Sequence, residues 1–193
     1  MSEIKDKISD LIRRVKPFDE IEQKHIGDAL EWILSGAEIF KIKSPDVPPK
    51  HIVSYSLLFD PEEKKILLLN HRKALLLLAS GGHVEKNEMP AETAKRELVE
   101  ELGIDPKPIL ENSGAPFFIS QVKTVGLTAG HIDVDLWYIF EGDSTRPIND
   151  QAEEFVREFA GYQWLALDEI LSMPLEKFDP NMHRFVKKLK ENY

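Results

Sequence analysis

The sequence predicts an α/β fold in which strands of mixed direction enclose one long acidic helix. Two segments have the length and patterning of strands: residues 51–59, and residues 131–140, which alternate at first and then become fully apolar. Between them, residues 90–102 place apolar side chains at helical spacing. The chain of 193 residues is 42% hydrophobic and 31% charged, which suits one soluble core domain with an appendage.

The first part of the chain is predicted to form a helical hairpin ahead of the core domain. Apolar residues follow helical spacing over residues 3–16 and again over residues 19–35. Pro17 separates the two segments and Gly36 ends the second. We therefore expect an N-terminal helical extension, residues 1–43, whose preferred role is to cap the core. A dimer contact and a lid over the substrate stay open as alternatives.

A linker and the core domain are predicted to follow. Residues 44–50 hold three prolines, which is typical of a linker, and residues 51–193 form the domain. Further strands are expected at residues 65–70, 74–79, 109–111, 117–123 and 162–167. Turns and loops are expected at residues 60–63, 71–73, 124–130 and 146–151, and helical or amphipathic segments at 153–159, 168–172 and 180–190.

The helix predicted over residues 90–102 has two different faces. Glu97, Glu100 and Glu101 fall at i, i+3 and i+4, so their carboxylates share one face and repel each other unless a cation lies among them. Oxygen ligands of this kind suit a hard divalent cation such as Mg²⁺ or Mn²⁺. The opposite face carries apolar residues that can pack on a core: Ala94, Leu98 and Leu102. The helix is therefore expected to pack on the core with its apolar face and to bind a metal ion with its acidic face.

Glycines flank this helix on both sides. Residues 80–83, Ser-Gly-Gly-His, follow an apolar run and are predicted to form a loop whose backbone can approach a metal or a phosphate closely. Pro90 suits the first helical turn, and Gly103 is a good C-cap. The predicted order is therefore a strand, a glycine-containing loop and a helix that is capped at its C-terminus by a glycine.

Together these residues match a known family motif. Gly82, Glu88 and the run from Arg96 to Ile104 reproduce the whole Nudix box with every spacing intact. The chain therefore resembles the Nudix hydrolases, and the resemblance implies an α/β/α sandwich with a mixed sheet. The acidic pattern E-x-x-E-E alone would more often be a solvated helix face, but the flanking glycines and Arg96 favour the family.

The resemblance implies metal-dependent hydrolysis of a diphosphate linkage in a nucleoside diphosphate derivative or a similar small phosphorylated metabolite, by attack of water on phosphorus. Glu97, Glu100 and Glu101 are then the expected ligands of Mg²⁺ or Mn²⁺, with Glu101 the strongest candidate, and the carbonyl of Gly82 adds a ligand. Glu88 is a supporting carboxylate or a further ligand. Arg96 lies four residues after Glu92 and is expected to pair with it or to brace the loop, as a structural and electrostatic part of the catalytic group.

The general base is less sharply defined. In many Nudix enzymes it is a carboxylate on a loop shortly before a late strand that contains tryptophan, and Trp164 matches that tryptophan. The match points first to Glu158. The other candidates are Glu154 and Glu153 on the same segment, and Asp133 and Asp135 on the strand over residues 131–140. A solvated acidic face explains each of them about equally well.

Substrate contacts are predicted from basic and polar residues near the edges of the expected site. Arg72 lies in a basic turn and could hold a phosphate. His83 follows the paired glycines. His131 and Asp133 share one face of their strand if side chains alternate. A surface or structural role is the more common explanation for any single histidine.

Composition excludes several classes of protein. The chain has no cysteine, which excludes disulfides, thiolate zinc sites and cysteine nucleophiles. Its net charge of −9 argues against a nucleic-acid polymer as partner. Its charged start and the lack of a long apolar span lead us to expect no signal peptide, no membrane partner and a cytoplasmic location. A homodimer stays open, because Nudix enzymes are often dimers.

Two other functions were weighed against hydrolysis. Isopentenyl diphosphate isomerases share the Nudix fold but use a catalytic cysteine, which this chain lacks. A non-catalytic nucleotide-binding or regulatory Nudix module is the main alternative. Such relatives usually lose box glutamates, and this chain keeps them all.

Overall fold

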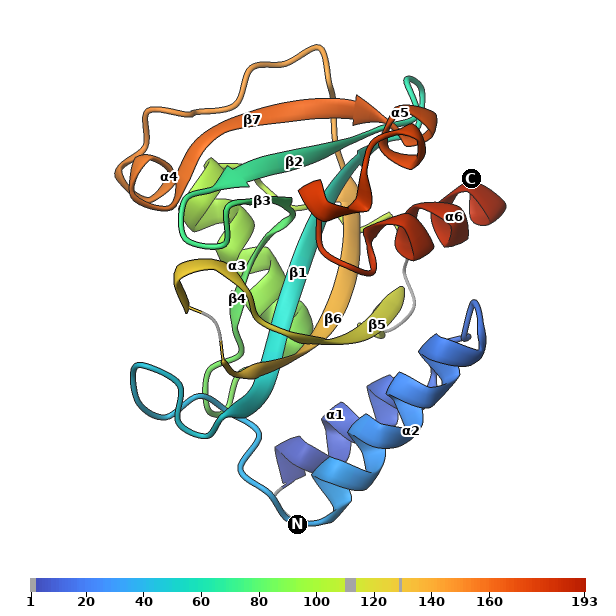
Figure 1. The fold of residues 1–193 in the computed structure, drawn as a ribbon, viewed down its shortest axis with the longest axis vertical. Helices are drawn as coiled ribbons and strands as arrows, with labels where there is room; N and C mark the ends of the chain where they lie inside the picture. Colours follow the sequence, from blue (N-terminus) through green and yellow to red (C-terminus); the bar gives the residue numbers. More distant parts are fainter. Residues whose placement is uncertain (1–2, 110–113, 129) are drawn as a thin grey trace.

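The computed structural model describes residues 3–109, 114–128 and 130–193, and it shows a mixed β-sheet with helices on both faces (Figure 1). The strands are β1 (Lys50–Asp60), β2 (Lys65–His71), β3 (Leu76–Leu78), β4 (Ser80–His83), β5 (Phe118–Lys123), β6 (Ile132–Glu141) and β7 (Phe159–Ala166). The helices are α1 (Glu3–Arg13), α2 (Glu20–Leu34), α3 (Pro90–Leu102), α4 (Glu153–Glu158), α5 (Leu167–Ser172) and α6 (Met182–Asn192), with short 3₁₀ helices η1 (Gly126–Thr128) and η2 (Leu175–Lys177).

Strand β1 is the centre of the sheet. It runs parallel to β6 along nearly its whole length, antiparallel to β4 over its first half, and antiparallel to β2 at its end. The strand order is β3-β2-β1-β6-β5, with β7 added on β2. Because β1 and β6 are covered on both faces, their sequences are almost continuously buried.

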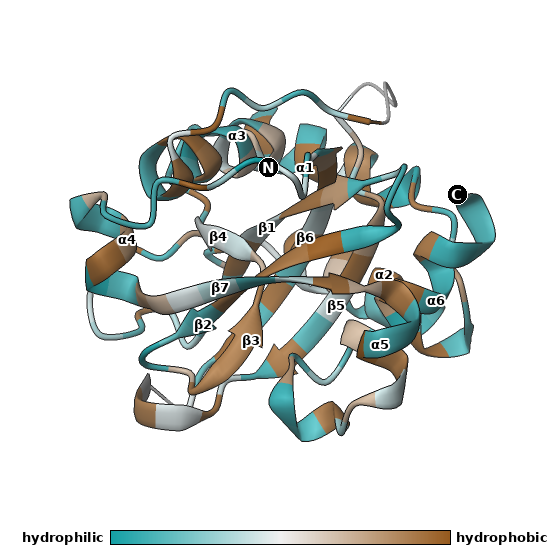
Figure 2. Cartoon of the chain, turned by 90° about the horizontal axis from the view of Figure 1, so that it is seen from above, coloured by the Kyte–Doolittle hydropathy of each residue, from teal (hydrophilic) through white to brown (hydrophobic). Residues whose placement is uncertain are grey.

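The sheet separates two hydrophobic cores. One core joins the sheet to α1, α2, α3 and α4, and the other joins it to α5 and α6. Figure 2 shows the hydrophobic strands in the middle of the molecule and hydrophilic residues on the outer helices. The predicted α/β/α sandwich with a mixed sheet and preceding helices is therefore confirmed.

The N-terminal helices form the predicted hairpin and pack on the rest of the chain. Ile8, Ile12, Ile26 and Ile33 are fully or almost fully buried in the same core as the acidic helix α3. Helix α2 also lies against β5. The division into an extension, a linker and a core domain stays a prediction.

Strand β4 corrects one expectation about local structure. Residues 80–83 were predicted as a loop, but they pair with β1, from Ser56 opposite Ser80 to Val53 opposite His83. A Cβ added to Gly81 would lie 2.3 Å from the carbonyl oxygen of Ser54, so only glycine allows this close approach. The preceding strand is shorter than the predicted residues 74–79, because Leu75 has a φ of 62° and belongs to a turn.

The remaining differences are small. The predicted strand at residues 109–111 lies mostly outside the described residues, and Pro108 beside it makes an isolated bridge to Phe140. The loop expected after β5 contains η1. The late strand is longer than predicted because β7 begins at Phe159, immediately after α4. Within the described ranges, we find no helix that is both long and apolar enough to cross a membrane.

Candidate active site

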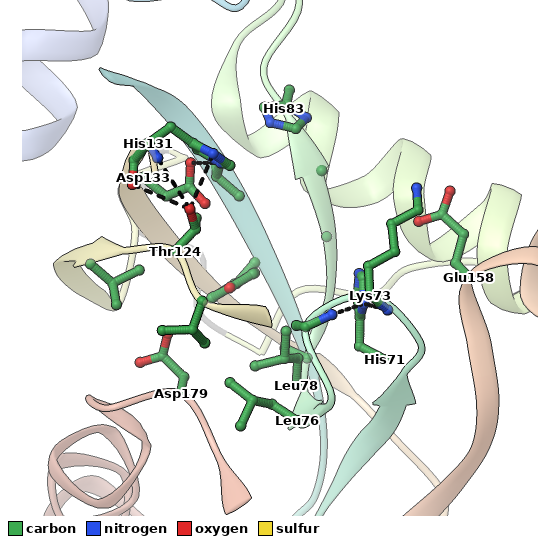
Figure 3. A pocket seen from close by; sticks show the side chains of 18 of the residues that line it. His71, Lys73, Leu76, Leu78, His83, Thr124, His131, Asp133, Glu158 and Asp179 are labelled. Carbon is green, nitrogen blue, oxygen red and sulfur yellow. Dashed lines mark hydrogen bonds and ion pairs between the residues drawn. The ribbon is translucent and has the colours of Figure 1, made fainter. Parts of the chain in front are cut away.

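A pocket of about 960 Å³ opens beside the acidic helix (Figure 3). Strands β1 and β4, helices α3 and α4, and the segments before β6 and α6 contribute to its wall. In Figure 3, His131 and Asp133 lie on one side of the view, and Glu158 and Lys73 lie on the other. The pocket therefore joins residues that are far apart in the sequence.

Two of the box glutamates line this pocket. Glu101 is 4% exposed, and its Oε2 accepts a hydrogen bond of 2.6 Å from Ser80 Oγ. Burial raises the pKa of Glu101 to about 8; Ser80 opposes the rise, and the negative charges of Glu97 and Glu158 add to it. Burial also raises the pKa of Glu97, although Arg96 opposes that rise. The negative charges of Glu97, Glu101 and Glu158 thus act on one another at this pocket.

The absence of a side chain at Gly82 makes room for one of these carboxylates. A Cβ added at Gly82 would lie 2.1 Å from Glu97 Oε1 and 2.6 Å from its Cδ. Glu97 therefore rests directly against the backbone of β4. This contact places the Glu97 carboxylate against the backbone of Gly82.

Arg96 connects the acidic residues of the box. Its guanidinium donates two hydrogen bonds to Glu88, of 3.0 and 3.2 Å, one of 2.8 Å to Glu97 and one of 3.0 Å to Glu100. Of the two contacts expected for it, the pairing with Glu92 is not seen, whereas the bonds to Glu88 join the helix to the preceding loop. Glu92 instead turns back to accept a hydrogen bond of 3.0 Å from the backbone N–H of Met89, at the start of the helix. The guanidinium thus neutralises part of the repulsion among the carboxylates, and the Glu88 contact lowers the pKa of that carboxyl.

The other acidic residues predicted for the site differ in whether they line the pocket. Glu158 ends α4 and lines the pocket. Glu100 is half exposed and lies outside the lining, as do Glu153 and Glu154. Asp135 is fully buried behind the pocket, where Ser120 Oγ donates a hydrogen bond of 2.9 Å to it. Among the candidates for the general base, only Glu158 and Asp133 line the pocket.

The predicted substrate contacts separate into two groups. His83, His131 and Asp133 line the pocket together. Arg72 lies outside the lining, and its guanidinium Nε donates a hydrogen bond of 3.0 Å to the carbonyl of Val156. The adjacent Lys73 lines the pocket instead.

A compact group of three histidines and one aspartate stands on the wall formed by the strands. His51 and Asp133 are directly paired in register between β1 and β6, and His83 ends β4. One ligand-capable atom from each of His51, His83, His131 and Asp133 lies within 4.8 Å of all the others. Burial, more than its charged neighbours, lowers the pKa of His83 to about 4. The link between His51 and Asp133 depends on the parallel pairing of two distant strands, which no local pattern in the sequence specifies.

The comparisons with known proteins assign the family. The family description "NUDIX domain" matches residues 49–189. No curated protein matches the chain. The chain therefore belongs to the Nudix family.

Solved structures show the same fold. A NUDIX-family hydrolase from Clostridium perfringens is 23% identical, with a TM-score of 0.52, over 74% of this chain and 98% of that one. The E. coli dihydroneopterin triphosphate pyrophosphohydrolase is 15% identical, with a TM-score of 0.56, over 81% and 100% of the two chains. The C. elegans Ap4A hydrolase is 13% identical, with a TM-score of 0.55, over 73% and 96%. At these identities the likeness extends to the fold alone.

Proposed function

We propose that this pocket hydrolyses a diphosphate linkage in a nucleoside diphosphate derivative or a similar small phosphorylated metabolite, by attack of water on phosphorus. The observation that carries the proposal is the meeting of Glu97, Glu101 and Glu158 at one pocket. Two come from α3 and the third from α4, so the fold brings them together across a long stretch of sequence. The names of the similar pyrophosphohydrolase and Ap4A hydrolase agree with such a substrate class.

The residues at the box fit Mg²⁺ or Mn²⁺. Glu101 presents a buried carboxylate and Glu97 one that is 13% exposed, Gly82 lets the backbone meet Glu97, and Glu100 lies one turn away toward solvent. Oxygen donors of this kind are the ones that hard divalent ions prefer. Glu97, Glu100, Glu101 and the Gly82 carbonyl are therefore the proposed ligands. When bound, such an ion neutralises diphosphate oxygens and lowers the pKa of water.

The side chains of the chain itself supply the remaining functions. Glu158 is the proposed general base that accepts a proton from the attacking water, because it faces the box glutamates across the pocket. Arg96 holds Glu97 and Glu100 in place. Lys73 lines the pocket and is positioned to bind a phosphate group of the substrate through its ammonium. Arg72, its neighbour in the sequence, lies outside the lining and adds positive charge that attracts an anionic substrate over a longer distance.

The far wall offers contacts to the other half of the substrate. His83, His131 and Asp133 line it, and we propose that they bind substrate. The apolar part of the lining includes Leu76 and Leu78 from β3 (Figure 3). A pocket of this volume and mixed lining suits a small metabolite.

The test is a panel assay for release of phosphate or nucleotide, with Mg²⁺ or Mn²⁺. The panel holds nucleoside triphosphates, oxidised nucleotides, ADP-ribose, NADH, dinucleoside polyphosphates, nucleotide sugars and coenzyme A. We expect metal-dependent turnover of one class, lost in Glu101→Gln and reduced about 10²- to 10⁴-fold in Glu158→Gln. Glu153→Gln, on the exposed side of α4, is the matched control and should retain activity. Full activity of Glu101→Gln, or no turnover of any class by the wild type, would overturn the proposal.

A further inference from the structure

The group of His51, His83, His131 and Asp133 is built from three neighbouring strands. His51 stands on β1 and Asp133 opposite it on β6, while His83 ends β4 and His131 immediately precedes β6. The rings of His51 and His131 are stacked with centroids 4.9 Å apart, and the rings of His51 and His83 are 4.7 Å apart. Sheet pairing fixes the backbones that carry these side chains, so the group is held by the most rigid part of the fold.

The protonation of His51 can be worked out from its neighbours. Its Nδ1 lies 3.0 Å from the carbonyl oxygen of Pro48, which can only accept a hydrogen bond. Nδ1 therefore carries a proton, and Nε2 is the ring nitrogen left to face the rest of the group. That Nε2 lies 3.1 Å from Asp133 Oδ1, and within the described residues neither atom has a hydrogen-bond partner. A buried ring nitrogen thus faces a buried carboxylate oxygen, an arrangement that a cation between them, a proton or a metal ion, would stabilise.

His131 repeats the same pattern. Its Nε2 lies 3.3 Å from the same Oδ1 of Asp133. Its Nδ1 lies 3.3 Å from Asp46 Oδ2 and 3.1 Å from Thr124 Oγ1. A histidine that binds metal through one ring nitrogen is usually oriented by a carboxylate at its other ring nitrogen. In His131 these are Nε2 and Nδ1.

His83 completes the group, and one basic residue lies nearby. Lys41 Nζ is 3.5 Å from His83 Nε2 and is paired at 3.0 Å with Asp46. The lysine donates and the histidine accepts, so this ring nitrogen also carries a lone pair in the metal-free protein. The charges of Lys41 and Asp46 offset each other, and Asp133 is the carboxylate within the group itself.

The donor set differs in kind from the glutamates of the box. Three imidazoles and one carboxylate suit a borderline divalent ion such as Zn²⁺, whereas Mg²⁺ prefers oxygen ligands alone. Tetrahedral ligands at zinc distances of about 2.0–2.1 Å are separated by roughly 3.3 Å. The contacts of Asp133 Oδ1 with His51 Nε2 and His131 Nε2, at 3.1 and 3.3 Å, match that separation.

We propose that His51, His83, His131 and Asp133 form a second metal site that binds Zn²⁺ or a similar transition ion, apart from the carboxylate site on α3. Three neutral imidazoles and one carboxylate leave a bound Zn²⁺ with one net positive charge. His83, His131 and Asp133 line the pocket, so with the ion bound their contact with an anionic substrate would be made through this charge, on the wall opposite Glu158. The site does not depend on the proposed hydrolysis, because it can bind metal without substrate.

The test measures metal binding in the full chain without any substrate. The protein is stripped with a chelator and dialysed against Zn²⁺ in the presence of excess Mg²⁺, which occupies the carboxylate site. Bound zinc is counted by elemental analysis, and Co²⁺ replaces Zn²⁺ to report coordination geometry by its visible absorption. We expect one zinc per chain in the wild type and a zinc-dependent rise in the melting temperature.

Four variants locate the ion. His83→Gln changes a residue on the pocket wall, and His51→Asn changes one behind it. Each should weaken zinc binding by about 100-fold or more, because loss of even an outer hydrogen-bond partner of a metal ligand typically lowers metal affinity about 10- to 100-fold. His183→Gln removes a histidine outside the group and should bind zinc as the wild type does. Glu101→Gln should also retain zinc. If His51→Asn does not fold, His83→Gln decides the result.

Several results would overturn the second site. One is the absence of stoichiometric zinc in the wild type under these conditions. Another is zinc retained by His83→Gln but lost by Glu101→Gln, which would place the ion on α3. A loss in His183→Gln equal to that in His83→Gln would show adventitious binding. Because no substrate is present, each result is independent of whether the diphosphate assay succeeds.

Discussion

Removal of the Glu22 carboxylate should strongly destabilise the protein, because this side chain joins the N-terminal hairpin to the rest of the fold. Glu22 lies on α2 and is fully buried. Its oxygens accept hydrogen bonds of 2.9 and 3.1 Å from Lys188 Nζ on α6. They also accept bonds from the backbone N–H groups of Phe18, at 2.6 Å, and Ile119, at 3.2 Å. Burial raises the pKa of Glu22 despite the nearby ammonium.

The size of the effect follows from the groups that lose their partner. In Glu22→Ala, the one hydrogen bond that Lys188 Nζ keeps within the described residues is to the carbonyl of Lys16, at 2.7 Å, and two backbone N–H groups lose their acceptor. Removing one member of a buried ion pair costs about 3–5 kcal/mol. For a chain of this length, about 2–4 °C of melting temperature is lost per kcal/mol, so we expect a fall of roughly 6–20 °C.

Urea unfolding followed by tryptophan fluorescence and circular dichroism measures this cost. Glu20→Ala, on the exposed side of the same helix, is the control and should change the free energy of unfolding by less than about 0.5 kcal/mol. The double variant Glu22→Leu with Lys188→Met removes both charges and should recover much of the loss. A loss below about 1 kcal/mol in Glu22→Ala would refute the reasoning, since that is the range of an exposed pair.

Three further predictions concern the acidic helix and the hairpin. Arg96→Gln should lower activity or affinity for Mg²⁺ by about 10- to 100-fold, measured by kinetics and metal titration, because the carboxylates lose the group that orients them. Gly82→Ala should lower kcat/KM by about 100-fold with an unchanged circular dichroism spectrum, because the new Cβ would lie 2.1 Å from Glu97 Oε1 and would displace it; unchanged kinetics would contradict the placement of Glu97. Arg184 holds the pKa of Asp19 below its usual 3.8, so this pairing stabilises the fold above that pH and is lost as the pH falls through the lowered value. The difference in free energy of unfolding between wild type and Arg184→Gln should thus be constant above about pH 5 and shrink in acid, and a difference that grows in acid would contradict it.

Local patterns in the sequence were sufficient for the acidic helix. Its predicted bounds, Pro90 to Leu102, agree with α3, and Gly103 caps it with a φ of 65°. Spacing and caps act between residues only a few positions apart, so they can be recognised without the rest of the fold. The same holds for the helical hairpin, whose apolar stripe is local although the buried pair that anchors it is not.

Contacts across the sheet could not be predicted in this way. The expected glycine loop is instead strand β4, which pairs with β1. Whether a glycine-rich segment forms a loop or a strand depends on the strand beside it, and that strand lies elsewhere in the sequence. For Arg96 the spacing left two roles open, pairing with Glu92 or bracing the loop, and only the folded chain shows its guanidinium on the loop residue Glu88. Glu158 reached the pocket through α4, and Glu154 and Glu153 did not.

The sequence by itself determined the family motif, the acidic helix and the chemistry of its carboxylates, since these depend on residue type and on short spacings. Only the tertiary structure decided which distant groups meet. The parallel register of β1 with β6 places His51 beside Asp133, and the end of β4 brings His83 to them. Such a meeting depends on strand order and register, which the whole core sets, and therefore no local pattern in the chain could reveal it.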